Sequence, residues 1–499
     1  MKVFKPRPII KQLGWLTAAL LCGCAVGPDY VRPVTTQGAD YSRDKLPAAT
    51  SSSDVLGGTA QRLIAGMDIP GLWWTLFRSP ELNDLVGEAL RANPNVAAAQ
   101  ASLRQANELA YADRASLFPT IGASASGTRE KASSGPFPPQ LLTVNAASLT
   151  VSYAPDVFGG TRRQIESAAA QAEYQRFQLE ATYLTLTANV VNTAVTLASV
   201  RDQIAATQEI VRVETAQLEV VKSRLRLGAL SNADLLAQEA AVAQTRATLP
   251  PLQKQLDQAR NQMTAYLGRF PNQERVEHFE LAGLHLPDEL PVSLPSAIVE
   301  QRPDVRAAEA QLHEASANIG VAIANQLPQF SLTGSMGTNA SRLADLFSSG
   351  TGVWSLVGSV TQTIFDAGAL RHRKLAAVAA YDASAAQYRG TVISAFQDVA
   401  NALQALQTDA DALKEQVAAE RAARDSLNLT QTQYRLGAVG YVNLLTAQQT
   451  YENAVLARVR AQASRYSDTV ALFQALGGGW WNRTEPLAQA PGETISSPR

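Results

Sequence analysis

Apolar residues recur at every seventh position along two long stretches of the chain. A seven-residue repeat keeps one apolar seam against a partner helix when the two helices supercoil. Residues 161–227 contain neither proline nor glycine, so the first stretch predicts an uninterrupted helix roughly 100 Å long. Its seam positions are Tyr183, Val190, Leu197, Ile204, Val211, Leu218 and Leu225. The second stretch has Val392, Val399, Leu406, Leu413, Leu427 and Tyr434, with Glu420 interrupting the register.

The two stretches belong to two copies of one unit, offset by about 209 positions. Coincidental matching of two alanine-rich helices does not explain why the offset holds at helix-breaking residues. The matched breakers are Pro94 and Pro303, Pro119 and Pro328, Gly228 and Gly437, and Gly268 and Gly477. We expect a first repeat at 73–281 and a second at 282–479. An extended lipid-anchored segment at 24–72 precedes them, and a C-terminal tail at 480–499 follows.

Each copy reads as helix, strand, loop, strand, long helix, break and helix. The first helices are predicted over about 80–116 and 295–326, because each stretch ends just before a proline. Strands are predicted where apolar residues alternate with small polar ones. Loops rich in proline, glycine and serine are expected at 133–139 and 348–352. The alternating apolar residues are Ile121, Ala123, Ala125, Leu149, Val151, Tyr153 and Val157, then Phe330, Leu332, Met336, Trp354, Leu356, Val360 and Ile364.

Four predicted strands are too few for one chain to cross a membrane alone. A closed barrel needs about eight strands, and an open sheet edge is not tolerated in lipid. Two chains would give eight strands, which side chains fill, whereas three would give twelve and leave room for a pore. The predicted fold is α+β and mostly α. It is a tandem-duplicated coiled-coil barrel of long helices, with four strands per chain in a trimeric twelve-stranded transmembrane β-barrel.

The N-terminus predicts a lipoprotein signal peptide at 1–23. Lys2, Lys5, Arg7 and Lys11 precede an apolar stretch at 13–21, which is too short to span a bilayer. Leu-Cys-Gly-Cys follows at 21–24 and resembles a lipobox, whose cleavage would leave Cys24 to carry a diacylglycerol and an N-acyl chain. The alternative is an ordinary signal peptide with a chance cysteine. Ala25 after the cysteine, rather than an aspartate, favours the outer membrane.

Cys24 would be the one cysteine of the processed chain, which excludes an intramolecular disulfide. No other window is apolar enough to predict a transmembrane helix. The formal net charge of −1 gives no reason to expect nucleic acid as a partner.

Several motifs together resemble the TolC-like outer-membrane efflux proteins, in particular the lipoprotein branch that serves resistance-nodulation-division pumps. They are the lipobox followed by Val-Gly-Pro-Asp-Tyr-Val-Arg-Pro at 26–33, Trp73-Trp74 with Phe77 and Pro-Glu-Leu at 80–82, Arg-Pro-Asp-Val at 302–305, and the turns at 226–231 and 435–440. The resemblance implies a homotrimer with a helical tunnel below the barrel. It also implies docking to a periplasmic membrane-fusion adaptor and an inner-membrane pump, with passive passage of drugs or other small molecules.

The two glycine turns are the best functional candidates. Glycine permits the left-handed conformation that ends a long helix and reverses the chain. In the resembled family these turns form the tip at which the adaptor docks; alternatively, the glycines only permit the turn. The docking candidates are Arg226, Gly228, Leu230, Ser231, Arg435, Gly437 and Val439.

The same resemblance makes Tyr434 and Thr446 candidates for the resting gate. Tyr434 matches a tyrosine that takes part in closure. Some relatives place an aspartate at Thr446 and an arginine at Gln449, so an acidic ring is not assumed here. Asp409 and Asp411 are interpreted as residues of a solvated helix face.

No residue pattern indicates catalysis, a metal site or a cofactor other than the covalent lipid. His278, His285, His313 and His372 lack metal-ligand spacing, and neither a nucleophile–base signature nor a phosphate loop is present. Trp73, Trp74, Trp480 and Trp481 are interpreted as core or belt residues.

The sequence therefore predicts an outer-membrane exit duct of a tripartite efflux system, and not an enzyme. Two alternatives remain: a protein-secretion channel of the same fold and a non-channel coiled-coil structural lipoprotein.

Overall fold

The computed structural model describes residues 25–33, 41, 47–132, 139–273, 279–292 and 295–483. The chain divides into two compact units. The first takes in residues 1–33, 102–176 and 307–389, and the second takes in 34–101, 177–306 and 390–499. Each unit combines segments from both predicted repeats. The predicted signal peptide and Cys24 lie outside the described residues, as do the loop at 133–138 and the tail after 483.

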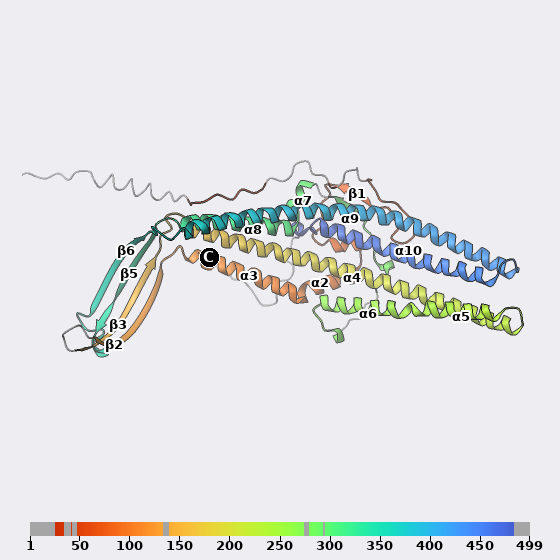
Figure 1. Ribbon diagram of the computed structural model, residues 1–499, viewed down its shortest axis with the longest axis horizontal. Helices are drawn as coiled ribbons and strands as arrows, with labels where there is room; N and C mark the ends of the chain where they lie inside the picture. The colour runs from red at the N-terminus through yellow and green to blue at the C-terminus, as the bar shows by residue number, and fades with distance from the viewer. Residues whose placement is uncertain are drawn as a thin grey trace, which may run out of the picture. The chain divides into compact units, whose positions relative to one another are not determined.

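The element order repeats itself along the chain with the predicted offset (Figure 1). The counterparts are α3 (Pro94–Ala115) and α8 (Pro303–Ala324), α4 (Gly160–Arg226) and α9 (Ala369–Arg435), and the pair α5 (Asn232–Ala247) and α6 (Leu249–Tyr266) against α10 (Tyr441–Ala475). Within each set the second copy begins 209 residues after the first. Pro250 and Pro251 fall at the start of α6, where proline is tolerated, and the uninterrupted α10 lacks both.

The long helices are continuous as predicted, with 67 residues each. Their seams are buried over part of their length: Val190 is 0% exposed in α4 and Leu413 is 0% exposed in α9. Glu420, which interrupts the second seam, is also buried and forms ion pairs with Arg424 of its own helix and Arg458 of α10. A charge at a seam position is therefore retained because it is paired across the helix interface.

The expected continuous helix over 80–116 is wrong at one position. Asn93 separates α2 (Pro80–Ala92) from α3, with φ −69° and ψ 124°. The ring of Pro94 disfavours helical geometry in the residue before it. The second copy breaks in the same way, with α7 (Pro295–Gln301) and α8 separated at Arg302, before Pro303.

Helix α4 also corrects the expectation that no further window could span a membrane. It contains an 18-residue window with a mean hydropathy of 1.2. Because 72% of that window is buried inside the protein, it has the character of a core helix rather than a lipid-facing one. It is the one such helix among the described residues.

Four strands form one antiparallel sheet in the order β2-β3-β5-β6 (Figure 1). They are β2 (Thr120–Ala132), β3 (Gln140–Tyr153), β5 (Gln329–Ala340) and β6 (Gly352–Thr361). The alternation predicted these strands, but Val157 and Ile364 lie beyond their ends. The predicted loop at 348–352 closes the β5–β6 hairpin, with Gly352 as the first strand residue.

The register gives the sheet two chemically different faces. One row across the four strands is Ala123, Leu149, Met336 and Trp354, and the next row on the other face is Gly122, Thr150, Ser335 and Ser355. On the polar face, serine hydroxyls of neighbouring strands are hydrogen-bonded to each other. The pairs are Ser124–Ser148 at 3.0 Å, Ser335–Ser355 at 2.8 Å and Ser331–Ser359 at 2.6 Å.

The second unit has a core where the ends of the repeats meet a short parallel pair of strands, β1 (Arg62–Ala65) and β4 (Glu289–Val292). Trp73 is 1% exposed and stacks on Phe473 at 5.3 Å. The predicted core role of Trp73 and Trp74 is consistent with their burial. The part of the chain that the structure describes also contains five short 3-10 helices: Trp73–Phe77, Pro271–Gln273, Leu281–Gly283, Leu343–Asp345 and Trp480–Asn482.

Candidate functional site

The first turn joins α4 to α5. Gly228 has φ +71°, and a Cβ added to it would meet nothing within 4 Å, so glycine is needed for its backbone conformation alone. The amide of Ala229 donates to the Arg224 carbonyl, and that of Gly228 donates to the Leu225 carbonyl, both at 2.9 Å. This is the Schellman pattern of helix termination. Ser231 then begins α5 with a capping box shared with Asp234.

The second turn joins α9 to α10 with the same termination. Gly437 has φ +75°, and the amides of Gly437 and Ala438 donate to the carbonyls of Tyr434 and Gln433. The start of α10 differs, because its N-cap is Gly440 and no side chain caps the helix.

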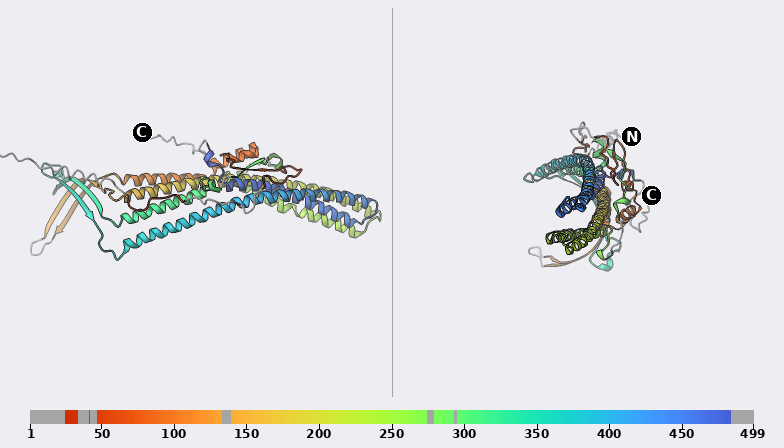
Figure 2. Two further views of the ribbon diagram at one scale, coloured as in Figure 1. Left: turned by 90° about the horizontal axis from the view of Figure 1, so that it is seen from above. Right: turned by 90° about the vertical axis from the view of Figure 1, so that its right-hand side faces the viewer.

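Helices α4 and α5 form one hairpin, and α9 and α10 form the other. A small apolar cluster connects the two hairpins close to these turns. It consists of Val221, Leu427, Tyr441 and Leu444. The Tyr441 hydroxyl donates to the side-chain oxygen of Gln238 on α5, which ties the start of α10 to the first hairpin. Burial raises the pKa of Tyr441 to about 12, so its hydroxyl remains a donor at physiological pH. Figures 1 and 2 show the two hairpins running side by side to the turns.

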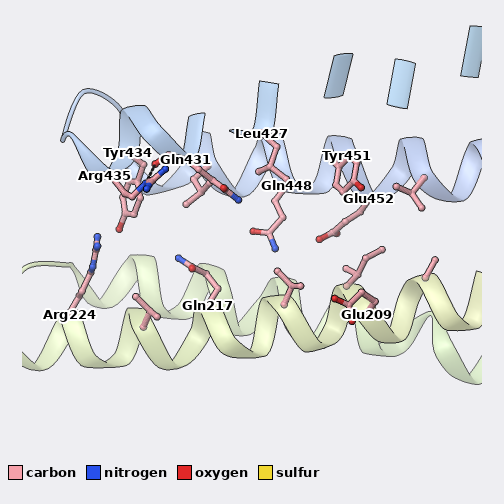
Figure 3. Close-up of a pocket in the computed structure, with 16 residues that line it drawn as sticks. Glu209, Gln217, Arg224, Leu427, Gln431, Tyr434, Arg435, Gln448, Tyr451 and Glu452 are labelled. Atoms are coloured by element: carbon pink, nitrogen blue, oxygen red, sulfur yellow. Dashed lines mark hydrogen bonds between the residues drawn. The ribbon is translucent and has the colours of Figure 1, made fainter. Parts of the chain in front are cut away.

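A cavity of about 660 Å³ lies beside this cluster, between α4 on one side and α9 and α10 on the other (Figure 3). Apolar side chains such as Ile210 and Val213 line it together with the polar side chains of Gln217, Gln431 and Gln448. Tyr434 and Arg224 face each other across it near the turns, with the guanidinium carbon 5.3 Å from the ring centre. This distance is within the range of a cation–π contact.

The predicted docking residues differ in exposure. Arg226, Gly228, Ser231, Arg435 and Gly437 are exposed, whereas Leu230 and Val439 are half-buried. Leu230 packs against the apolar cluster, so it supports the turn as well as lying in it. Both arginines bond within their own helix: Arg226 to the Ser223 hydroxyl at 3.2 Å, and Arg435 to the Thr432 hydroxyl at 3.2 Å.

The two gate candidates are not brought together. Tyr434 lines the cavity, packs edge-on against Tyr441 at 5.6 Å and has a buried hydroxyl without a hydrogen-bond partner. Thr446 is exposed and donates to the Val442 carbonyl of its own helix at 2.9 Å. Their gating roles stay predictions.

The sequence reading missed two kinds of residue at this site. Leu227 and Leu436, just before the glycines, are 83% and 80% exposed. The sequence feature that could have identified these two leucines is an apolar side chain outside the heptad seam. Glu214 and Glu452 are acids within the hairpin interface, where burial raises the pKa of both, that of Glu452 to about 8. No sequence signal distinguished them from the solvated acids of the same helices.

The other candidate residues fall elsewhere. Asp411 is exposed and accepts a hydrogen bond from Ser51, whereas Asp409 is half-buried beside Asp468 of α10 and does not lie on a solvated face. That interpretation of Asp409 is corrected. His313 pairs with Glu166 at 2.9 Å, and His278 lies outside the described residues. Within the described residues, no group of three or more metal-ligating side chains is found.

Comparison with known proteins identifies the family. The family model for outer membrane efflux proteins matches residues 85–269 and 294–478. This chain belongs to the outer membrane efflux protein family. The two matches are themselves 209 residues apart at both ends, which confirms the duplication, although the exact domain boundaries stay a prediction.

Relatives and solved structures agree with this assignment. The chain is 29% identical to the probable efflux pump outer membrane protein TtgC of Pseudomonas putida, over 94% of this chain and 95% of that one. It is 28% identical to the probable outer membrane lipoprotein SilC of Salmonella typhimurium, over 94% and 99%. The solved outer-membrane channel OprN superposes with a TM-score of 0.81 at 28% identity, covering 92% of this chain and all of that one.

The predicted fold, outer-membrane location and role as an efflux exit duct are therefore confirmed. The protein is a channel-family member whose relatives work as efflux pump components.

Proposed function

We propose that three copies of this chain form a twelve-stranded barrel in the outer membrane, continued by a helical tunnel in the periplasm. Drugs or other small molecules would pass through it passively, and the chain itself would catalyse no reaction. Nucleic acid has no part in this function. The partners are a periplasmic membrane-fusion adaptor and an inner-membrane resistance-nodulation-division pump.

The two-faced open sheet is the observation that carries this proposal. Strands β2 and β6 are at its edges, each paired on one side within the described residues. Its apolar face exposes large side chains, including Leu149, Met336 and Trp354, whereas the opposite face is lined with serine and threonine. A closed barrel of such sheets would put the first face against lipid and the second around a water-filled pore.

The exposed turns support adaptor docking. Each offers a leucine more than three-quarters exposed, next to an arginine. Exposed apolar residues ringed by polar ones are typical of protein interfaces. Gly228 and Gly437 hold both leucines in the same local geometry, so three copies would present six equivalent contacts to adaptor hairpins.

The trimer and its pore can be tested together. We expect the detergent-solubilised particle to have three times the mass of the processed chain, and the reconstituted protein to give single-channel conductance in planar bilayers. A monomer would contradict the assembly. A trimer without conductance would instead favour the structural-lipoprotein alternative.

Adaptor docking has a separate test. We expect Leu227→Ser combined with Leu436→Ser to abolish binding of the adaptor while conductance remains. Leu429→Ser is the matched control, since Leu429 is 59% exposed on α9 but lies away from the turns. Unchanged adaptor binding by the double variant would exclude the tips as the docking site.

Lipidation of Cys24 completes the proposal, supported by the lipobox and by the relative named as a lipoprotein. We expect Cys24→Ser to weaken membrane anchoring without abolishing the trimer. The measurement is the fraction of trimer released from membranes by high salt. Loss of the folded trimer would contradict this view of the lipid as an anchor.

A further inference from the structure

The cavity between α4, α9 and α10 is large enough for a drug-sized molecule. Its volume is about 660 Å³, and pockets for such ligands have volumes of about 300–1,000 Å³. Along α4 its lining residues run from Ala206 to Arg224, which corresponds to about 27 Å of α-helix. All of its walls belong to the second unit. The cavity is therefore formed within one chain and does not depend on the proposed trimer or pore.

Apolar side chains line the cavity on both sides. Val213 and Val220 of α4 are each 45% exposed. Leu427 of α9 and Val455 of α10 belong to the opposite wall. Apolar surface inside a concave site is released from water when the body of a ligand covers it. The cavity therefore favours a ligand with an apolar body.

The charged residues of the cavity are separated along its length (Figure 3). Arg224 and Arg435 lie at the end near the turns, and Glu209 and Glu452 lie at the other end. From Glu209 to Arg224 the helix rises by about 22 Å, which is more than twice the screening length at physiological salt. Glu209 pairs with Arg212 at 2.8 Å, whereas Glu452 has no ion pair within the described residues. A cation at the acidic end would therefore meet an unpaired carboxyl group.

A second carboxyl group lies close to Glu452. Glu214 of α4 is 0% exposed, and its Oε1 accepts a hydrogen bond from the Thr245 hydroxyl at 3.1 Å. Its Oε2 has no hydrogen-bond partner within the described residues. Burial, followed by the charge of Glu214, raises the pKa of Glu452 to about 8. Glu452 therefore keeps a proton at neutral pH, which an ammonium group would replace.

We propose that this cavity binds a lipophilic amine, whose ammonium group pairs with Glu452 and whose apolar body lies against Val213, Leu427 and Val455. Glu214 supplies further negative charge close to the ammonium group. The ligand contacts α4 on one side and α9 and α10 on the other. It therefore joins the two hairpins and stabilises the arrangement in which they are packed together.

Two probes of the same shape test the need for a positive charge. They are naphthylmethylammonium and the neutral naphthalenemethanol, and their fluorescence allows equilibrium dialysis against the full-length processed protein in amphipol. We expect saturable binding of the ammonium probe at one site per chain. The alcohol should bind about ten-fold more weakly, because it lacks the charge-assisted hydrogen bond to Glu452. Equal binding of the two probes would overturn the proposal.

Glu452→Gln removes the carboxyl group and nearly keeps the shape of the side chain. We expect its affinity for the ammonium probe to fall about ten-fold, with the affinity for the alcohol unchanged. Glu219→Gln is the matched control, since the Glu219 side chain is 68% exposed on α4, pairs with Lys222 and does not line the cavity. If Glu452→Gln lost binding of both probes, or of neither, the role of Glu452 would be refuted.

Filling the cavity tests its location independently of charge. Val213→Phe places a ring in the cavity from a half-exposed position, and we expect both probes to lose binding. Val442→Phe is the matched control, since Val442 is 62% exposed on α10 and does not line the cavity. Full binding of the probes to Val213→Phe would contradict the assigned site.

Hydrogen exchange tests whether the ligand joins the hairpins. We expect the ammonium probe to slow exchange of the amides at 210–217 of α4 and at 448–455 of α10, and to have no such effect on Glu452→Gln. Protection of only one of the two segments, or of the strands instead, would contradict a ligand held between the hairpins.

Discussion

The two turns end their long helices identically and begin their return helices differently. At Gly228 and Gly437 the backbone conformations and hydrogen bonds are equivalent. After the first turn, Ser231 and Asp234 cap α5 with their own side chains. After the second, Gly440 caps nothing, and α10 is fixed instead by Tyr441, which is 4% exposed in the interface between the hairpins.

The start of α5 is therefore stabilised by neighbouring side chains of its own helix, whereas the start of α10 is stabilised by a tertiary contact. Tyr441 corresponds to Asn232 in the first copy, and Gly440 and Asn443 correspond to Ser231 and Asp234. The first hairpin therefore carries its own helix start, whereas the second depends on its neighbour. Any rearrangement that parts the hairpins would loosen the second turn first.

Removing the tertiary contact should have the largest effect. Tyr441→Ala is expected to destabilise the start of α10 by about 3 kcal/mol, because the ring is lost and the side-chain oxygen of Gln238 loses its donor. Hydrogen exchange of the α10 amides measures it. Asn232→Ala is the control at the matching, exposed position and should have almost no effect. Similar hydrogen-exchange rates in the two variants would contradict the proposed difference between the starts of α5 and α10.

Substitution of the two turn glycines should affect both hairpins equally. Gly228→Ala and Gly437→Ala are each expected to cost about 1 kcal/mol, because alanine must adopt a positive φ. Gly390→Ala, inside α9 with nothing within 4 Å of an added Cβ, should instead stabilise the helix. Thermal unfolding of the trimer compares the three. If the two glycine variants lost different amounts of stability, the turns would be equivalent in backbone geometry but not in energy.

Removing the capping residue of α5 should destabilise the first hairpin, and adding a capping box to α10 should stabilise the second. Ser231→Ala is expected to weaken α5 by about 1 kcal/mol, because the amide of Asp234 loses its acceptor. Gly440→Ser with Asn443→Asp should recreate the box on α10 and slow hydrogen exchange there. The substitution fits, since nothing lies within 4 Å of a Cβ at Gly440. No gain in α10 would show that Tyr441 already fixes its start completely.

A further expected effect is a pH dependence confined to the interface between the hairpins. Burial, followed by the nearby charge of Glu214, raises the pKa of Glu452 to about 8, above its value in the unfolded chain. The folded state then holds a proton that the unfolded state has released, so stability falls as pH rises from about 4.5 to about 8. The counterpart residue is Ala243. Glu452→Gln should reduce the dependence of α10 stability on pH, measured by hydrogen exchange. Glu219→Gln, on the exposed face, should leave that dependence unchanged.

The long helices and the turns could be predicted because each depends on residues close together in sequence, and the repeats because the same pattern recurs at one constant offset. Heptad spacing predicts a helix and its seam, and a glycine after a long run of helix formers predicts its end. The break at Asn93 is also local, because the ring of Pro94 disfavours helical geometry in the residue before it. The surroundings of Asp409 could not be predicted, since its neighbour Asp468 lies on another helix.

The amino-acid sequence alone determined which stretches form helices and strands, and that the chain contains two copies of one unit. It did so through periodicity and backbone conformation, which act over a few residues. Only the tertiary structure decided which acids are buried together and that Tyr441, the first residue of α10, packs in the interface between the hairpins. The same holds for the hydrogen bonds that Arg163 donates to Val26 and Asp29. Burial and pairing depend on neighbours distant in sequence, whose positions no local pattern specifies.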